Sequence, residues 1–124
     1  MKLYLLVALF GAAGSVLRYF FFLITPKIYY LNFPIATVSV NLLGSFFIGF
    51  CLSLFDKGYI GDSTKVYIMF GLLGGFTTFS TFSMDLYNLI NKMFYFQATA
   101  YLFLSVVGGL IFFILGQKLS ILIQ

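Results

Sequence analysis

The chain has 124 residues, of which 62% are hydrophobic and 8% are charged, and its formal net charge is +4. This composition excludes a soluble globular domain and indicates an integral membrane protein. Because the chain contains no histidine, no glutamate and a single cysteine, it lacks the usual groups for metal, nucleophilic or acid–base catalysis, and we predict no enzymatic activity.

Four apolar segments are long enough to cross a membrane, since a spanning helix needs roughly 20 apolar residues. Charged or turn residues separate them: Pro26-Lys27, Asp56-Lys57-Gly58 and Asn91-Lys92. The sequence therefore predicts an all-α protein that forms a single transmembrane domain over residues 1–124, with adjacent helices antiparallel. The predicted spans are residues 3–25, 34–55, 66–89 and 94–117.

The first segment carries small residues at helical spacing and one cation. Gly11, Gly14 and Ser15 predict a face that packs closely against another helix. The apolar stretch continues well past these residues, which argues against a cleaved signal peptide. Arg18 lies near the end of the segment, where it either extends to the lipid headgroups or supplies a positive field at a pore mouth.

The positive charges show no clear bias between the two sides of the membrane. Four spans place both termini on one side, which then carries four cations, and the other side carries three. Since orientation follows an excess of Lys and Arg, this count fits either insertion in both orientations or a weakly biased single orientation. The two sets are Lys2, Lys57, Lys65 and Lys118, and Lys27, Lys92 and Arg18.

Polar residues recur every fourth position in the second and fourth segments, so each set forms a stripe along one helix face. The stripes are Thr37, Asn41 and Ser45, and Tyr101, Ser105 and Gly109. At 1.5 Å per residue, Asn41 lies about 10 Å and Ser105 about 15 Å inside their helices, near the midplane. Interhelical hydrogen bonding alone accounts for the hydroxyls, whereas burying the Asn41 amide requires several partners.

The third segment contains the run Gly-Leu-Leu-Gly-Gly-Phe-Thr-Thr-Phe-Ser-Thr-Phe-Ser at residues 71–83. Gly74 and Gly75 weaken a helix, and the hydroxyls offer the backbone other hydrogen bonds, so we predict a break at these glycines. Carbonyls freed at Gly74 and Thr77 suit a small hard cation such as sodium. Asp85, farther along, is expected to cap the helix or to pair with a cation.

Three motifs together resemble the Fluc (CrcB) family of fluoride channels, in order and over the whole length of the chain. They are Gly-Gly-Phe-Thr-Thr-Phe-Ser-Thr-Phe-Ser at 74–83, Val-Asn-Leu-Leu-Gly at 40–44 and Gly-Ser-Val-Leu-Arg-Tyr at 14–19. The chain departs from the family pattern at Phe10, at residues 36–38 and at Asp85, where a glutamate is usual.

The resemblance implies a passive fluoride channel of the bacterial inner membrane. It implies a dual-topology homodimer of antiparallel subunits with two pores, and a structural sodium ion held on the two-fold axis by the carbonyls of Gly74 and Thr77. The fluoride pore residues that it implies are Asn41, Phe79, Phe82, Ser80, Thr81, Tyr101, Ser105 and Thr37, with Arg18 at the mouth.

Two other classes of protein stay open at this point. A dual-topology transporter of the multidrug type requires a carboxylate in the first span, whereas this chain has Arg18 there. A non-conducting structural membrane subunit is opposed only by the polar residues near the midplane.

Overall fold

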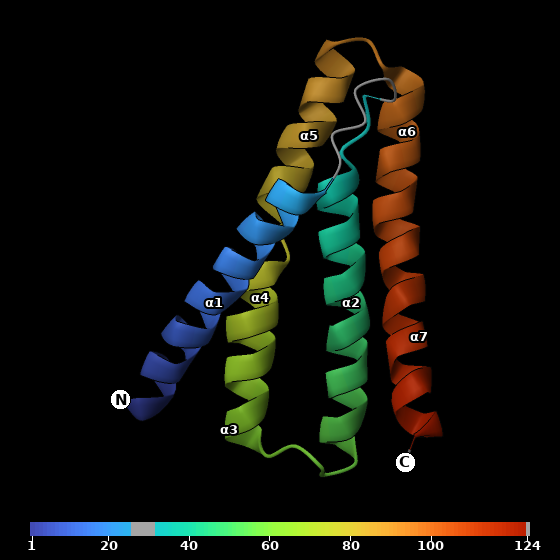
Figure 1. Ribbon diagram of the computed structural model, residues 1–124. Helices are drawn as coiled ribbons and strands as arrows, with labels where there is room; N and C mark the ends of the chain where they lie inside the picture. Colours follow the sequence, from blue (N-terminus) through green and yellow to red (C-terminus); the bar gives the residue numbers. More distant parts are fainter. Residues whose placement is uncertain (26–31, 124) are drawn as a thin grey trace.

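The computed structural model describes residues 1–25 and 32–123, and this part of the chain is helical apart from short connections and one internal break. Figure 1 shows the elements in chain order. Pro26 and Lys27, which we predict to end the first span, lie outside the described residues. The elements are α1 (Lys2–Ile24), α2 (Ile35–Asp56), α3 (Asp62–Lys65), the π-helical η1 (Val66–Leu73), α4 (Gly74–Phe76), α5 (Phe79–Asn91), α6 (Tyr95–Phe103), the π-helical η2 (Leu104–Gly108) and α7 (Gly109–Leu122).

Four helical stretches are long and apolar enough to cross a membrane: Lys2–Ile24, Ile35–Asp56, Asp62–Asn91 and Tyr95–Leu122. The predicted all-α class with four spans is confirmed, and the chain is a multi-pass membrane protein. The third helix begins at Asp62, ahead of residue 66, and Asp62 lies in its first turn, where a negative charge is favourable. The fourth continues to Leu122, past residue 117, because no proline interrupts it.

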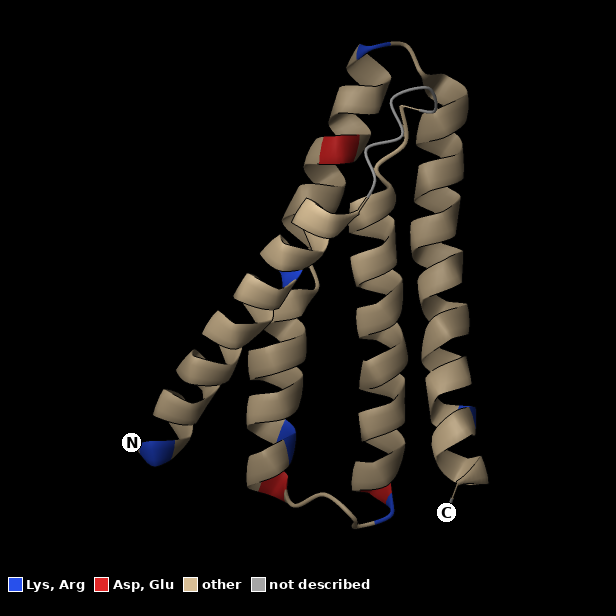
Figure 2. Ribbon diagram, in the orientation of Figure 1, with Lys and Arg blue, Asp and Glu red and all other residues tan. Residues whose placement is uncertain are grey.

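Both termini lie at one end of the bundle, together with the connection between α2 and α3, and the α5–α6 turn lies at the other (Figure 1). Most of the charged positions gather at these two ends (Figure 2). Two charges interrupt the apolar length of the helices instead: Arg18 in α1 and Asp85 in α5. These two residues are therefore the ones that need partners inside the bundle.

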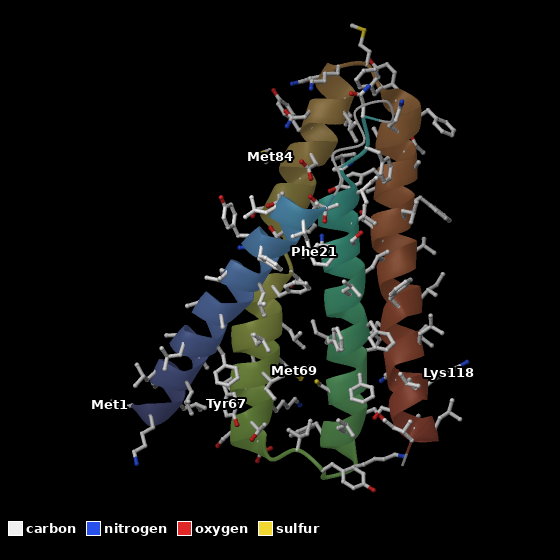
Figure 3. The ribbon with its side chains drawn as sticks, in the orientation of Figure 1. Met1, Phe21, Tyr67, Met69, Met84 and Lys118 are labelled. Atoms are coloured by element: carbon white, nitrogen blue, oxygen red, sulfur yellow. The ribbon has the colours of Figure 1, made fainter. Side chains whose placement is uncertain are left out.

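The helices pack mainly in two pairs, α1 against η1 and α4, and α2 against α7. Gly14 of α1 is buried, and a Cβ atom there would overlap the carbonyl oxygen of Leu72, so the close approach requires glycine. Farther along α1, Phe21 meets Phe76 of α4 edge to face with ring centroids 6.3 Å apart, where α1 passes the third helix (Figure 3). The predicted packing face of α1 thus holds it against the half of the third helix that precedes the break.

The third helix is interrupted at Thr77 and Thr78, which are extended, with φ −76° and ψ 159° at the first and φ −150° and ψ 119° at the second. The predicted break in the middle of the third helix is confirmed, but it falls on the threonines of the glycine-threonine run, because Gly74 and Gly75 are helical in α4. A glycine costs a helix only about 1 kcal/mol, and hydrogen bonds from other helices to the two threonines outweigh that preference. The π-helical stretches η1 and η2 are not predicted from the sequence.

Candidate functional site: a helix break between two cavities

The break is held from the neighbouring helix by the side-chain amide of Asn41 in α2. Its Nδ2 donates to the carbonyl oxygen of Thr78 at 3.0 Å, and its Oδ1 accepts the backbone N–H of Thr78 at 2.8 Å. Thr78 is buried, so both backbone groups need protein partners. The predicted requirement of Asn41 for several hydrogen bonds is met by one residue of the break.

Thr78 also starts α5 with its side chain. Its Oγ1 accepts the backbone N–H of Thr81 at 3.2 Å, which caps the helix, and donates to Thr81 Oγ1 at 3.0 Å. Ser80 Oγ lies 3.3 Å from the same hydroxyl. Thr78 is not among the residues predicted from the sequence, although a threonine directly before a helical segment is a recognised capping signal.

Arg18 lies at the break rather than at the end of α1. Its Nη1 donates to the carbonyl oxygen of Thr77 at 3.1 Å, over a separation of 59 residues in the sequence. A carbonyl oxygen has two lone pairs, so this bond leaves one acceptor position on Thr77. The guanidinium places a fixed positive charge beside the break.

One cavity lies next to the break and has a volume of about 270 Å³. Asn41 and Phe82 line it, together with Ser105 from η2, whose buried Oγ has no hydrogen-bond partner among the residues that the structure describes. An unpaired buried hydroxyl is costly, and π-helical turns are frequent at functional sites. We call this space the inner cavity; its other lining residues are Ser45, Ile48, Thr77, Thr78, Phe79 and Val106.

Two phenylalanines of α5 form the aromatic wall of the inner cavity. The rings of Phe79 and Phe82 have centroids 5.5 Å apart, as their predicted common face requires. Tyr101 stacks on Phe82 at 5.2 Å with an angle of 29° between the ring planes, so it covers one face of that ring. Phe82 is only 8% exposed, whereas Phe79 is 79% exposed and lies open on the surface of the single chain.

The second cavity, of about 520 Å³, lies toward the α5–α6 end of the bundle and is called the outer cavity here. Thr37, Thr81 and Asp85 are among its lining residues, as is Lys92. Thr37 Oγ1 donates to Asp85 Oδ2 at 2.6 Å, and the Tyr101 hydroxyl donates to the same oxygen at 3.3 Å. Asp85 was expected to cap the helix or to pair with a cation, and its observed partners are two hydroxyls instead.

The predicted pore residues thus fall into two groups joined by Tyr101, which contacts Phe82 in the inner cavity and Asp85 in the outer one. Ser80 lines neither cavity and is exposed, next to Thr78. The inner group is Asn41, Phe79, Phe82 and Ser105, and the outer group is Thr37 and Thr81.

Helices of spanning length, an interrupted helix and polar cavities beside the interruption define a small multi-pass membrane protein of the channel or transporter class. Residues 5–117 match the family described as CrcB-like protein, Camphor Resistance (CrcB). The chain belongs to this family, which confirms the resemblance found in the sequence.

Curated relatives match nearly the full length of the chain. A protein of Desulfotalea psychrophila is 44% identical over 92% of this chain and 88% of its own length. A protein of Ignicoccus hospitalis is 38% identical over 97% of this chain and 96% of its own length. A protein of Helicobacter pylori is 40% identical over 94% of this chain and 92% of its own length. All three are named "Fluoride-specific ion channel FluC". Ion channels are not enzymes, in agreement with the prediction from composition.

Proposed function

We propose that this chain forms a fluoride-selective channel through which fluoride leaves the cytoplasm passively, across the inner membrane of a bacterial cell. The observation that carries the proposal is that relatives at 38% to 44% identity, over at least 92% of this chain, are fluoride-specific ion channels by name. The inner cavity supports it, because hydrogen-bond donors and the rings of Phe79 and Phe82 line the same space beside the break.

Fluoride is small and strongly hydrated, so a pore must replace its hydration shell with donors. In the inner cavity, Asn41 keeps a second N–H beyond the one that bonds to Thr78. The unpaired hydroxyl of Ser105 provides another donor. These two groups are the proposed first contacts of the ion.

The aromatic wall supplies a weaker attraction. The edge of a phenyl ring is the positive end of its quadrupole. Because Tyr101 covers a face of Phe82, the edge of Phe82 is the part left for an anion, and Phe79 continues this wall toward the surface. Such contacts attract fluoride without a binding site so deep that the ion stays.

In the outer cavity the path continues past Thr81 and Thr37. Tyr101 is fully buried and lines neither cavity, so we propose that it lies between the two cavities along the path, and Ser80 lies near Thr78. The hydroxyls of Thr37 and Tyr101 donate to Asp85 in this structure, so an ion that binds them must compete with the carboxylate. The charge of Arg18 beside Thr77 raises the positive potential near the break and favours an anion.

We further propose that the channel is an antiparallel, dual-topology homodimer with two pores. Phe79 supports this, since a proposed pore residue that is 79% exposed needs a cover, and a second copy would enclose the inner cavity. The near-equal cation count on the two sides fits insertion in both orientations.

A structural sodium ion on the two-fold axis is proposed to bind the carbonyls of Gly74 and Thr77. The residues fit a hard cation. In a continuous helix the N–H of Thr78 would bond to the Gly74 carbonyl, but here it bonds to Asn41, and Thr77 keeps one lone pair beside the bond from Arg18. When bound, the ion would supply a central positive charge that joins the two breaks.

Fluoride efflux from liposomes containing the purified protein tests the proposed function. We expect efflux well above that of protein-free vesicles, and little efflux of chloride. Equal efflux with and without protein would leave the non-conducting subunit as the better account, and proton-driven efflux of organic cations would favour the multidrug-type transporter.

The variant Phe82→Ile tests the role of the aromatic edge. Isoleucine keeps an apolar side chain but has no ring quadrupole, so we expect fluoride efflux to fall at least tenfold, the effect of about 1.4 kcal/mol, while the dimer still assembles. Leu86→Ile, a change at a partly buried residue of the same helix that lines neither cavity, is the matched control. Wild-type efflux by Phe82→Ile would contradict a role for the ring edge.

A further inference from the structure

We infer that Asn41 is a positioning residue that holds the break in the third helix open, in addition to its proposed contact with fluoride. The inference deepens the proposed function and rests on it only for the part that concerns the ion. The observation behind it is the pair of hydrogen bonds between one side-chain amide and both backbone groups of one residue, Thr78.

The orientation of the amide is fixed by its partners. A backbone N–H can only donate and a carbonyl can only accept, so Oδ1 must face the N–H of Thr78 and Nδ2 must face its carbonyl. The two bonds, at 2.8 Å and 3.0 Å, resemble the exchange of bonds between paired strands. This geometry matches the extended backbone of Thr78, with φ −150° and ψ 119°, and an α-helical residue would not present both groups to one side.

The bond to Oδ1 replaces a helical bond. In an unbroken helix the N–H of Thr78 would donate to the carbonyl of Gly74, four residues earlier. Asn41 takes this donor, and the helix ends after Phe76, so the Gly74 carbonyl does not accept this helical bond. The side-chain amide of Asn41 therefore determines whether the third helix is continuous or broken.

The position of Thr78 in turn sets the start of α5. Its hydroxyl caps that helix and bonds to the hydroxyl of Thr81, and Phe79 and Phe82 follow within the first turn. Through Thr78, Asn41 thus positions the aromatic wall and the proposed pore hydroxyl of Thr81. A substitution that removes the Asn41 acceptor allows the Thr78 N–H to donate to the Gly74 carbonyl, as in a continuous helix. We expect this change to rotate α5 about its axis.

The inference is tested by NMR of the peptide bond between Thr77 and Thr78, through its chemical shift and its hydrogen-exchange rate. Thr77–Thr78 is the only Thr-Thr pair in the chain, so threonine labelled with ¹³C and ¹⁵N gives a single ¹³C′–¹⁵N signal from this bond. The carbon shift of Thr77 distinguishes extended from helical backbone, and hydrogen exchange reports the bonding of the Thr78 N–H. For the full-length protein with Asn41→Ala, we expect the ¹³C′ chemical shift of Thr77 to move away from the value typical of extended backbone, or the hydrogen-exchange rate of the Thr78 N–H to rise about tenfold.

The variant Asn41→Asp separates the positioning role from the ion contact. The NMR spectrum of this variant is recorded at a pH low enough to keep the carboxyl group neutral, because the positive charge of Arg18 beside the break favours the ionised form. The C=O and O–H of the neutral group can make the same two bonds to Thr78. Its one O–H is then used, so no donor remains for fluoride. We expect the Thr77–Thr78 signal to stay close to that of the wild type while fluoride efflux falls at least tenfold.

Ser45→Ala is the matched control, because Ser45 lines the same cavity one turn farther along α2, and we expect the Thr77–Thr78 signal to be unchanged. The inference is overturned if Asn41→Ala leaves both the carbon shift and the exchange rate as in the wild type. If Asn41→Ala does not fold, a folded Asn41→Asp with a fast-exchanging Thr78 overturns it. Absence of fluoride efflux from the wild type would instead refute the proposed function, and the comparison at Thr78 would still decide the role of Asn41.

Discussion

The hydrogen bond from Thr37 to Asp85 gives the most direct quantitative prediction. Thr37 is 3% exposed, and its Oγ1 lies 2.6 Å from Asp85 Oδ2. Thr37→Val replaces the hydroxyl with a methyl group of similar size, so the change removes the bond and little packing. A hydrogen bond to a charged group contributes about 1.5–3 kcal/mol. We therefore expect the free energy of unfolding to fall by about that amount, which is roughly a 10- to 150-fold change in the unfolding equilibrium.

Reversible unfolding in mixed micelles, followed as denaturing detergent is added, measures this free energy. Thr37→Ser is the matched control, because it keeps the hydroxyl and loses one methyl group, worth about 0.8 kcal/mol. A double-mutant cycle with Asp85→Ala isolates the pair, and we expect a coupling of at least 1 kcal/mol. A coupling near zero, or equal losses in Thr37→Val and Thr37→Ser, would refute the assignment of the bond.

Two further predictions follow from the inner cavity and from the packing of α1. Since the Ser105 hydroxyl is buried without a partner in the described residues, Ser105→Ala should raise the free energy of unfolding by about 1 kcal/mol and still lower fluoride efflux; a loss in stability would show that the hydroxyl has a partner. Gly14→Ala should lower the free energy of unfolding by about 1–3 kcal/mol, because its Cβ would overlap Leu72, whereas Gly61→Ala, where a Cβ meets nothing within 4 Å, serves as the control; equal stabilities would contradict the close packing.

The sequence predicts the spans well because hydrophobicity over some 20 residues is a large, summed signal. The break is harder to locate, since the local cost of Gly74 and Gly75 is small and the decisive partner, Asn41, belongs to another helix. The sequence does mark Asn41 as a side chain in need of several partners, but it does not show that Thr78 provides them.

The polar contacts of the two internal charges were the least predictable part of the site. Arg18 reaches Thr77 and Asp85 reaches Thr37 only because α1 and α2 pass close to the third helix. Such contacts depend on helix rotation and crossing, which hydrophobic periodicity fixes poorly when most faces of a helix are apolar. The π-helical turn that presents Ser105 likewise has no clear local signal.

The position of the two termini at the same end of the bundle limits how two copies of this chain can be joined into one polypeptide (Figure 1). In the proposed antiparallel pair, the C-terminus of one copy and the N-terminus of the other would face opposite aqueous compartments. A short polar linker would therefore force the copies to insert in parallel, and a gene fusion compatible with the proposed antiparallel pair would need one membrane-crossing helix between the copies. Duplication of the gene without fusion carries no such requirement, and each copy is then free to acquire the charge bias of one orientation.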